Sequence, residues 1–259
     1  MTSLILILFG IVGLAFGSFL NVVIYRLPRG ESLIRPGSHC PACRHPLSAI
    51  DNVPVFSYML LGGKCRYCGA PVSGRYPLVE LLTGVLFVLA FVEFGLSVQT
   101  ALACLASAVL IAVAFIDLDH LLVLDWSVVA LGAIGLVRAL TERDIIGALE
   151  GAALGAAIFG AVYLGTRGAG LGLGDVKLGA ALGLLYGFPL GLGVAVAAFV
   201  IGALLAVPIL LAGKRGRRDA LPFGPFLVLA SLIATYAPLA ISGPYEWYRA
   251  LLQSYWTRG

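Results

Sequence analysis

The chain has 259 residues, of which 60% are hydrophobic and 12% are charged, and its mean hydropathy is +1.01. A chain of this composition lacks the polar surface that a water-soluble particle of its size needs, so an ordinary soluble protein is excluded. Its formal charge of +4 includes no aromatic-interleaved basic patch, and we expect no nucleic-acid partner. The composition therefore predicts an all-α integral membrane protein in contact with lipid.

Apolar segments of roughly 20 residues, the length that a membrane-spanning helix needs, recur along the chain. The first is uncharged and no small-residue cleavage site follows it, so we expect a retained helix rather than a removed signal peptide. Gly187 and Pro189 divide one long uncharged stretch into two spans. The sequence thus predicts about eight transmembrane helices, in residues 1–25, from 77 onward, 94–116, 125–138, 145–166, the two halves of 178–213, and 221–241.

The polar residues divide the chain into four expected parts: a first helix 1–25, a loop 26–76, a transmembrane core 77–242 and an interfacial tail 243–259. The tail holds aromatic residues typical of a membrane interface, namely Tyr245, Trp247, Tyr248 and Trp256. Of the 17 basic residues, 13 fall on one side if the N-terminus lies outside, and four on the other, namely Arg138, Arg143, Arg249 and Arg258. This positive-inside pattern places the loop in the cytoplasm.

Four of the five cysteines lie in the polar loop as two Cys-x-x-Cys pairs, Cys40 with Cys43 and Cys65 with Cys68. Two such pairs can supply the four thiolates of a tetrahedral zinc site. Two disulfides or a redox-active pair are the alternatives, but structural disulfides are uncommon in a reducing cytoplasm. We therefore predict a structural Zn²⁺ that stabilises a loop too small for a large core.

Three other side chains near this chemistry receive a separate interpretation. His39 and His45 flank the first cysteine pair and could replace a zinc ligand, although histidines in polar loops are usually solvated. Cys104 lies inside an uncharged span, so we expect it to pack against other apolar groups.

Carboxylates within a membrane are costly, by about 2.5 kcal/mol or more at mid-bilayer, so each one needs a reason. Asp117, Asp119 and Asp125 lie where the third span meets the cytoplasm, and Asp175 begins the sixth span at the same face. Two carboxylates close enough to share a proton can hydrolyse a peptide bond, because one accepts a proton from water while the other donates to the carbonyl. The pattern therefore permits an aspartyl peptidase.

A glycine-rich segment precedes Asp175, and its Gly172 and Gly174 are expected to allow unusual backbone angles and the close approach of a substrate strand. The glycine run also looks like a dinucleotide-binding fingerprint, but it follows a membrane helix and not a strand. For any one of these acids taken alone, the alternative to catalysis is an ordinary charged residue at the membrane interface, balanced by Lys177 and Arg167. It suits Asp119 and Asp125 best.

Several motifs occur together in a specific order, namely Gly17-Ser-Phe-Leu-Asn, Ser38-His-Cys-Pro-Ala-Cys, Asp51-Asn-Val-Pro, Ser73-Gly-Arg-Tyr-Pro-Leu-Val-Glu80, Ile116-Asp-Leu-Asp-His120, Gly172-Leu-Gly-Asp175 and Pro222-Phe-Gly-Pro225. Through them the chain resembles the bacterial type IV prepilin leader peptidases, membrane enzymes of the aspartyl class. The resemblance implies that Asp117 and Asp175 are the catalytic pair. We expect Gly172, Gly174 and Lys177 to form a supporting loop.

The resemblance further implies prepilin and pseudopilin substrates, whose basic leader is cut at the cytoplasmic face of the bacterial inner membrane. Members with a four-cysteine loop also look like N-methyltransferases that use S-adenosylmethionine, and the motif match makes Arg75, Tyr76 and Glu80 candidates for that activity. One departure is Leu124, because the family usually has proline before the acid matched by Asp125. This weakens any role for Asp125.

Two other function classes compete with this interpretation. A proton-coupled transporter predicts internal repeats and broken helices near mid-membrane, whereas these acids cluster at one face and no convincing repeat is found. A membrane zinc module without catalysis would leave the glycine-rich segment and the two acids unexplained.

Overall fold

The computed structural model describes residues 2–211 and 222–243, and all regular elements within these ranges are helices. The aromatic residues expected at the interface, Tyr245, Trp247, Tyr248 and Trp256, lie outside them. The helices are α1 (Thr2–Arg26), η1 (Leu27–Arg29), η2 (Ile50–Asn52), α2 (Phe56–Leu60), α3 (Arg75–Phe94), α4 (Val98–His120), α5 (Asp125–Glu142), α6 (Ile145–Thr166), α7 (Leu173–Tyr186), α8 (Leu190–Leu211) and α9 (Gly224–Tyr236). The predicted all-helical fold is confirmed.

Among the described residues, five helical segments are long and apolar enough to cross a membrane: Thr2–Arg29, Arg75–Phe94, Val98–His120, Ile145–Thr166 and Leu190–Val207. Three further helices correspond to predicted spans but do not meet the same criteria. With 14 and 13 residues, α7 and α9 are about 20 Å long, less than the ~30 Å hydrocarbon core. Helix α5 carries three charged residues among its 18. All eight predicted segments thus form helices, but eight complete crossings are not confirmed.

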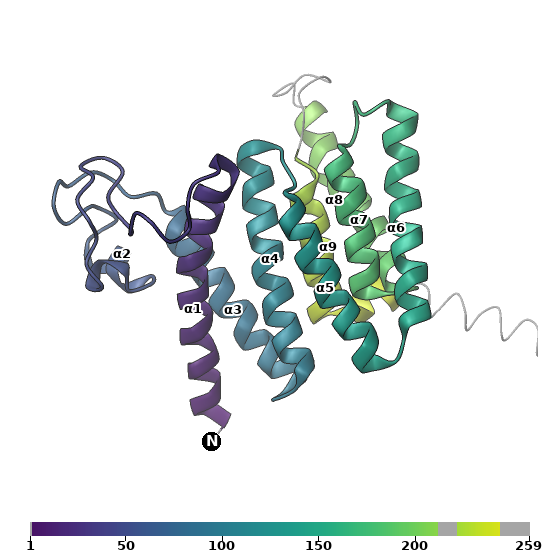
Figure 1. The fold of residues 1–259 in the computed structure, drawn as a ribbon, viewed down its shortest axis with the longest axis horizontal. Coiled ribbons are helices and arrows are strands. Elements are labelled where there is room, and N and C mark those ends of the chain that lie inside the picture. Colours follow the sequence, from purple (N-terminus) through teal and green to yellow (C-terminus); the bar gives the residue numbers. More distant parts are fainter. Residues whose placement is uncertain (1, 212–221, 244–259) are drawn as a thin grey trace, which may run out of the picture. The chain divides into compact units, whose positions relative to one another are not determined.

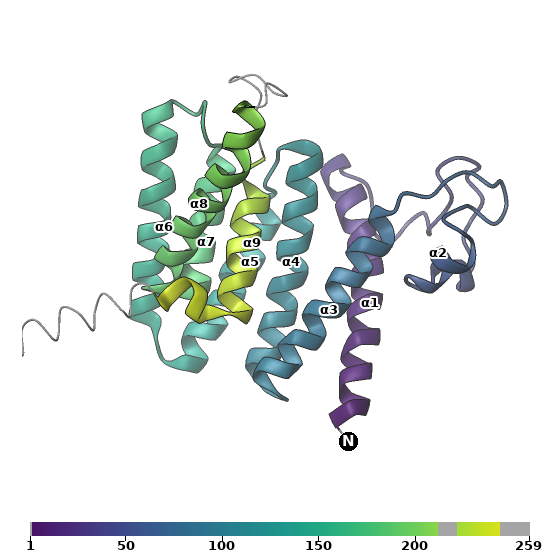
Figure 2. The same cartoon turned by 180° about the vertical axis from the view of Figure 1, so that it is seen from behind.

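The chain divides into two compact units, residues 1–112 and 113–259, and α4 runs from the first into the second. In the first unit α1 and α3 lie antiparallel and side by side (Figures 1 and 2). Their backbones nearly touch, because a Cβ added to Gly17 would lie 2.5 Å from the Glu80 Cα and one added to Gly13 would lie 2.7 Å from the Gly84 Cα. Small residues at four-residue spacing permit such close helix packing in membranes.

In the second unit, α6 and α7 pack through glycines on both helices (Figure 1). A Cβ added to Gly155 would lie 2.8 Å from the carbonyl carbon of Gly179, and one added to Gly183 would lie 2.5 Å from that of Gly151. On another side of α7, a Cβ on Gly135 of α5 would lie 2.7 Å from the Leu185 Cα. Helix α7 is therefore held against α5 and α6 by direct backbone contact.

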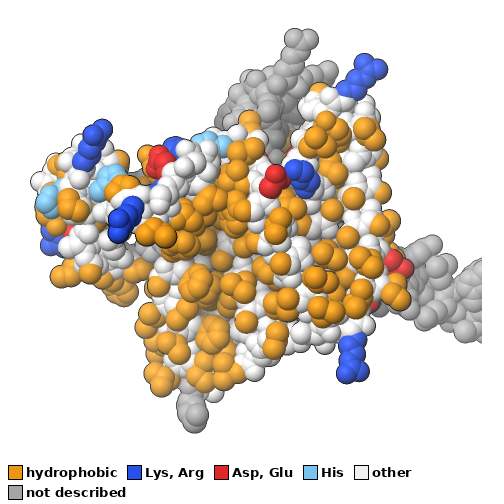
Figure 3. All heavy atoms as spheres, in the orientation of Figure 1, with side chains coloured by type: hydrophobic (Ala, Val, Ile, Leu, Met, Phe, Trp, Pro, Cys, Tyr) orange, Lys and Arg blue, Asp and Glu red, His pale blue; other side chains and the backbone are white. Residues whose placement is uncertain are grey.

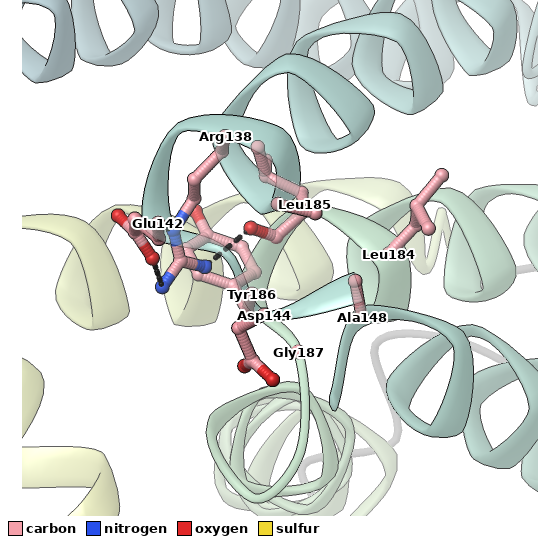
Figure 4. A pocket seen from close by; sticks show the side chains of 9 residues that line it. Arg138, Glu142, Asp144, Ala148, Leu184, Leu185, Tyr186 and Gly187 are labelled. Atoms are coloured by element: carbon pink, nitrogen blue, oxygen red, sulfur yellow. Dashed lines mark hydrogen bonds and ion pairs between the residues drawn. The ribbon is translucent and has the colours of Figure 1, made fainter. Parts of the chain in front are cut away.

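The C-terminal end of α7 is also fixed by polar contacts. Arg138 of α5 donates a hydrogen bond to the Leu185 carbonyl, and the guanidinium lies 3.0 Å from the Glu142 carboxylate (Figure 4). The Tyr186 hydroxyl donates to the Ser231 carbonyl of α9 at 2.7 Å. A cation at the end of a helix satisfies a free carbonyl and complements the helix dipole. These contacts join α7 to α5 and α9.

A small pocket, with room for about one water molecule, lies beside Arg138 at this end of α7 (Figure 4). Its lining residues include Asp144, Leu185 and Gly187. Asp175 lies in the first turn of the same helix, about 15 Å farther along its axis. The pocket is therefore separate from the predicted catalytic acids. Gly187, with φ of +68°, and Pro189 separate α7 from α8, as predicted.

Candidate active site and candidate metal centre

Asp117 lies near the C-terminal end of α4 and is 5% exposed. Its Oδ2 accepts a hydrogen bond of 2.8 Å from the backbone N–H of Gly224, which lies 107 residues later in the chain. Gly224 is the first residue of α9, and the N–H groups of a first helical turn have no partner within their own helix. The positive end of the helix dipole also stabilises a carboxylate there. Helix α9 thus anchors Asp117.

Gly224 is a contact of Asp117 that sequence reasoning missed. The motif Pro222-Phe-Gly-Pro225 contributes to the family resemblance but by itself indicates no role for its glycine. A Cβ at Gly224 would lie 2.7 Å from the Asp117 Oδ2, so only glycine fits without displacing the carboxylate. The available signal was a glycine directly before Pro225, in the first turn of an apolar helix, where proline is favoured.

Asp175 occupies the third position of α7 and has a similar anchor. Its Oδ2 accepts a hydrogen bond of 2.9 Å from the Gly172 N–H, while its own N–H donates to the Gly172 carbonyl at 3.1 Å. This carboxylate also lies at the positive end of a helix. Asp175 lies near enough to Asp117 for its charge to act on that carboxylate, so the structure places the two predicted acids in one neighbourhood.

The two glycines before Asp175 do not have the unusual backbone angles that we expected. Gly172 has φ −83° and ψ 162°, which any residue can adopt, and Gly174 lies within α7. Gly174 is required for a different reason: a Cβ there would lie 2.9 Å from the Cβ of Val123, in the loop between α4 and α5. At Gly172 the nearest atom would be 3.6 Å away, an ordinary contact. Gly174 therefore allows α7 to begin directly against that loop.

Lys177 forms an ion pair with Asp125, with 2.6 Å between Nζ and Oδ1. Lys177, the fifth residue of α7, has a side chain that is 52% exposed, and Asp125, the first residue of α5, has one that is 75% exposed. Asp119 is exposed at the end of α4. These positions agree with the interfacial-charge interpretation of Asp119 and Asp125, and they give Lys177 a structural contact near Asp175.

The four loop cysteines form a compact cluster, with all four Sγ atoms within 4.8 Å of one another. Cys40 and Cys68 have sulfurs 3.9 Å apart, close to the ~3.8 Å edge of a tetrahedron with 2.3 Å Zn–S bonds. All five cysteines of the chain are free, so the disulfide alternative is not adopted. Neither His39 nor His45 belongs to the cluster, and His45 packs on the Tyr67 ring with centroids 3.7 Å apart. This donor set suits Zn²⁺.

The two cysteine pairs have the same backbone fold. Cys40 N–H donates to the His45 carbonyl and Arg44 N–H donates back to the Cys40 carbonyl, at 3.0 and 2.8 Å. The second pair has the same two bonds. Cys65 N–H donates to the Ala70 carbonyl at 2.8 Å, and Gly69 N–H donates to the Cys65 carbonyl at 2.9 Å. In each pair, the fourth residue after the first cysteine has a positive φ, which is 58° at Arg44 and 71° at Gly69. Two copies of one knuckle therefore present their sulfurs to a common point.

The thiols of the cluster differ in acidity. Hydrogen bonds from the backbone N–H groups of Cys43 and Ala42 lower the pKa of Cys40 to about 6. The Ala70 N–H lowers the pKa of Cys68, but desolvation and the neighbouring thiols outweigh it and raise that pKa to about 11. Because a metal binds thiolates, zinc binding must release the Cys68 proton at neutral pH.

Asp51 connects the segment between the knuckles to the second knuckle. Its carboxylate accepts hydrogen bonds from the Ser48 hydroxyl at 2.7 Å, the Arg66 Nε at 2.6 Å and the Tyr67 hydroxyl at 3.2 Å. The Ser48 hydroxyl, followed by the Arg66 guanidinium, holds the pKa of this carboxyl far below its usual range. The group therefore stays ionised and keeps Arg66 in place.

Two family models match the chain. The Bacterial Peptidase A24 N-terminal domain matches residues 11–94, and the Type IV leader peptidase family matches residues 104–207. The chain belongs to the type IV leader peptidase family. The first match includes all four clustered cysteines, and the second includes Asp117 and Asp175. Gly224, which anchors Asp117, lies beyond the matched residues.

Curated relatives agree with this family assignment. A Myxococcus xanthus protein named prepilin leader peptidase/N-methyltransferase is 42% identical over 80% of this chain and 64% of its own length. Proteins of the same name from Aeromonas hydrophila and Legionella pneumophila are 36% and 35% identical, over 85% and 88% of this chain and 87% and 89% of their own lengths. No solved structure is significantly similar.

The candidate methyltransferase residues lie in the first two turns of α3. The Tyr76 carbonyl accepts a hydrogen bond of 3.1 Å from the Asn21 side chain of α1. Glu80 is buried and its side chain accepts a hydrogen bond of 2.8 Å from the Val55 N–H of the loop. Its backbone packs on Gly17 of α1, so Glu80 contacts both α1 and the loop. A role for Arg75, Tyr76 or Glu80 in methyl transfer remains a prediction from the motif.

Proposed function

We propose that this protein is an aspartyl peptidase that removes the basic leader from prepilins and pseudopilins at the cytoplasmic face of the bacterial inner membrane. The observation that supports this most directly is the pairing of Asp117 with Asp175, each held by a backbone N–H at the N-terminus of a different helix. The names of the relatives supply the substrate class.

The anchoring leaves one oxygen of each carboxylate available for chemistry. In both residues Oδ2 accepts the backbone hydrogen bond, and within residues 2–211 and 222–243 neither Oδ1 has a hydrogen-bond donor. In the proposed mechanism the pair holds one proton. The ionised carboxylate accepts a proton from the attacking water while its partner donates to the carbonyl oxygen of the scissile bond. Both acids then exchange roles as the leaving amine departs.

The membrane would position the substrate in this proposal. With the N-terminus outside, the acids and the four-cysteine loop face the cytoplasm, where the basic leader remains. The apolar pilin helix would stay in the bilayer and present its first peptide bond at the level of the acids. Holding the reactants in this geometry lowers the entropic part of the barrier.

The same proposal assigns N-methylation of the new N-terminus to the loop, residues 26–76, and peptide cleavage to residues 77–242. Cys40, Cys43, Cys65 and Cys68 would hold a structural Zn²⁺. S-adenosylmethionine would supply the methyl group. The observation that supports the metal is that four sulfurs converge in a loop where, of residues 27–74, only Cys40 and Cys65 are buried.

The test is a reaction of the purified protein with a prepilin peptide and S-adenosylmethionine, followed by mass spectrometry. We expect a cleaved product and a cleaved product that is one methyl group heavier. A proton-coupled transporter or a zinc module without catalysis would leave the peptide intact. An intact peptide after incubation with folded, zinc-loaded protein would overturn the proposal.

A further inference from the structure

The four-cysteine loop carries exposed apolar side chains although its composition is polar. Helix α2 and the turn before it expose Ile50, Val53, Phe56, Met59 and Leu60, which we call the α2 patch; their exposed fractions run from 42% at Val53 to 84% at Leu60. Figure 3 shows hydrophobic side chains along the lower edge of this loop, the side where Figure 1 places α2. Contiguous apolar patches on a small polar module mark an interaction surface.

The orientation of α2 is fixed from its opposite face. The Tyr58 side chain points toward the second knuckle, because a Cβ added to Gly63 would lie 2.9 Å from its hydroxyl. The same hydroxyl would be 3.6 Å from a Cβ at Gly74, the residue before α3. Val55, directly before α2, donates its N–H to Glu80. With Tyr58 directed inward, Phe56, Met59 and Leu60 point outward.

The pairing of α1 with α3 shows how deep each part of the loop lies. Glu80 is about 7 Å along α3 from its first residue, Arg75, at 1.5 Å per residue. The bond from Val55 therefore holds the start of α2 near Glu80, which lies inside the candidate span together with the exposed Leu78 and Leu81. Interfacial helices bury their apolar face ~5–10 Å into the boundary between headgroups and acyl chains. The depth of α2 matches this boundary.

The other end of the loop is held much farther out. Arg26, the last residue of α1, is buried and donates to the carbonyls of Ser32 and Gly37 at 2.9 and 3.3 Å. Gly17 of α1 packs on Glu80, and Arg26 lies about 13 Å farther along the helix. The start of the first knuckle, which follows Gly37, is therefore held farther out along the helix axis than the start of α2.

The charge of the loop complements an anionic bilayer. Residues 26–76 contain two acidic side chains, Glu31 and Asp51, against seven basic ones: Arg26, Arg29, Arg35, Arg44, Lys64, Arg66 and Arg75. Basic side chains beside a membrane surface each add attraction to anionic headgroups. We propose that the α2 patch inserts into the headgroup region of the bilayer, so that the four-cysteine loop is an interfacial module and not a freely solvated domain.

Photo-crosslinking of the full-length protein tests this in nanodiscs of phosphatidylethanolamine and phosphatidylglycerol. The photoreactive amino acid p-benzoylphenylalanine replaces Leu60 in one variant and Ser38, an exposed residue next to Gly37, in the matched control. After irradiation, mass spectrometry separates phospholipid adducts from cross-links within the chain and between chains. We expect a lipid-adduct yield at Leu60 that is several-fold above that at Ser38.

Three results would overturn the proposal: Leu60 cross-linked to a peptide of residues 113–259, Leu60 cross-linked to a second copy, or equal lipid yields at both positions. Leu60 is 84% exposed, so its replacement removes no internal packing, and zinc content confirms that each variant is folded. Hydroxyl-radical footprinting of the unmodified protein gives an independent measurement. Phe56 and Met59 should be protected in nanodiscs while His39 is oxidised, and full oxidation of all three would also contradict insertion.

Discussion

The four-cysteine loop and the helices that carry the two aspartates differ in what holds them together. Within residues 27–74 only Cys40 and Cys65 are buried, so the loop has almost no apolar core. In the second unit α7 is fixed by backbone contacts with α5 and α6 and by a hydrogen bond to α9. The loop should therefore be sensitive to loss of its metal, and the helices to atoms added at the glycines where one backbone touches another.

The largest expected effect is on the acids themselves. Asp117→Asn and Asp175→Asn should each lower leader cleavage by about 10²–10⁴-fold or more, because each change removes one half of the proton-sharing pair. Cleavage of a prepilin peptide is measured at matched membrane protein levels. Asp125→Asn, which removes only an exposed ion pair, is the matched control and should be milder. Near-normal cleavage by either variant of the pair would remove that residue from the mechanism.

Loss of the metal should affect the four-cysteine loop much more than the membrane helices. Replacing Cys40 and Cys43 with serine should remove about one zinc per chain and unfold the loop, whereas the membrane helices keep their internal hydrogen bonds. Methylation should then fall further than cleavage, scored by mass spectrometry of intact, cleaved and methylated peptide. If the inserted variant loses cleavage as completely as Asp175→Asn, the two activities are not separable.

Zinc affinity should depend steeply on pH, since the metal binds thiolates. The Cys40 pKa of about 6 and the Cys68 pKa of about 11 mean that lowering the pH toward 6 protonates the first ligand and makes the second harder to ionise. Affinity should therefore fall with pH, and binding at neutral pH should release protons. Titration of metal-free protein in buffers of different ionisation enthalpy measures this release, and a pH-independent affinity would contradict a thiolate site.

Packing of α6 on α7 can be tested with two glycines of the same helix. Gly155→Ala should lower the stability of the detergent-purified protein by about 1–3 kcal/mol, because the added Cβ meets the backbone of Gly179. Gly165→Ala should leave it unchanged or slightly raised, since no neighbouring atom lies within 4 Å. Thermal unfolding compares the two. Equal melting temperatures would show that the Cβ added at Gly155 does not weaken the packing of α6 on α7.

The smallest expected difference in cleavage rate is between alanine variants of the two glycines before Asp175. Gly174→Ala should reduce cleavage several-fold, because its Cβ would displace Val123 or α7, whereas Gly172→Ala meets only an ordinary contact. Initial rates with one peptide substrate are compared at equal protein amounts. A larger loss for Gly172→Ala would mean that the glycine motif serves the substrate and not the packing of α7.

Hydropathy and residue spacing predicted much of the fold and the candidate site. Each of the eight apolar segments forms a helix, and the cysteine spacing brought four sulfurs together. The anchor of Asp117 could not be predicted, because its donor is a backbone N–H that carries no side-chain signal and belongs to α9. The reason for Gly174 was also inaccessible, since it depends on Val123 in a loop that packs on it only in three dimensions.

Asn21 of α1, bonded to the Tyr76 carbonyl at 3.1 Å, brings the two ends of the four-cysteine loop to neighbouring points. The pairing of α1 with α3 therefore closes that loop, with the accompanying loss of chain entropy, before any metal binds. For a flexible segment this cost rises by only about 0.6 kcal/mol for each doubling of length. The segment between α1 and α3 can consequently be lengthened, shortened or exchanged with little effect on the helices, so that chains with very different loops can share one membrane framework.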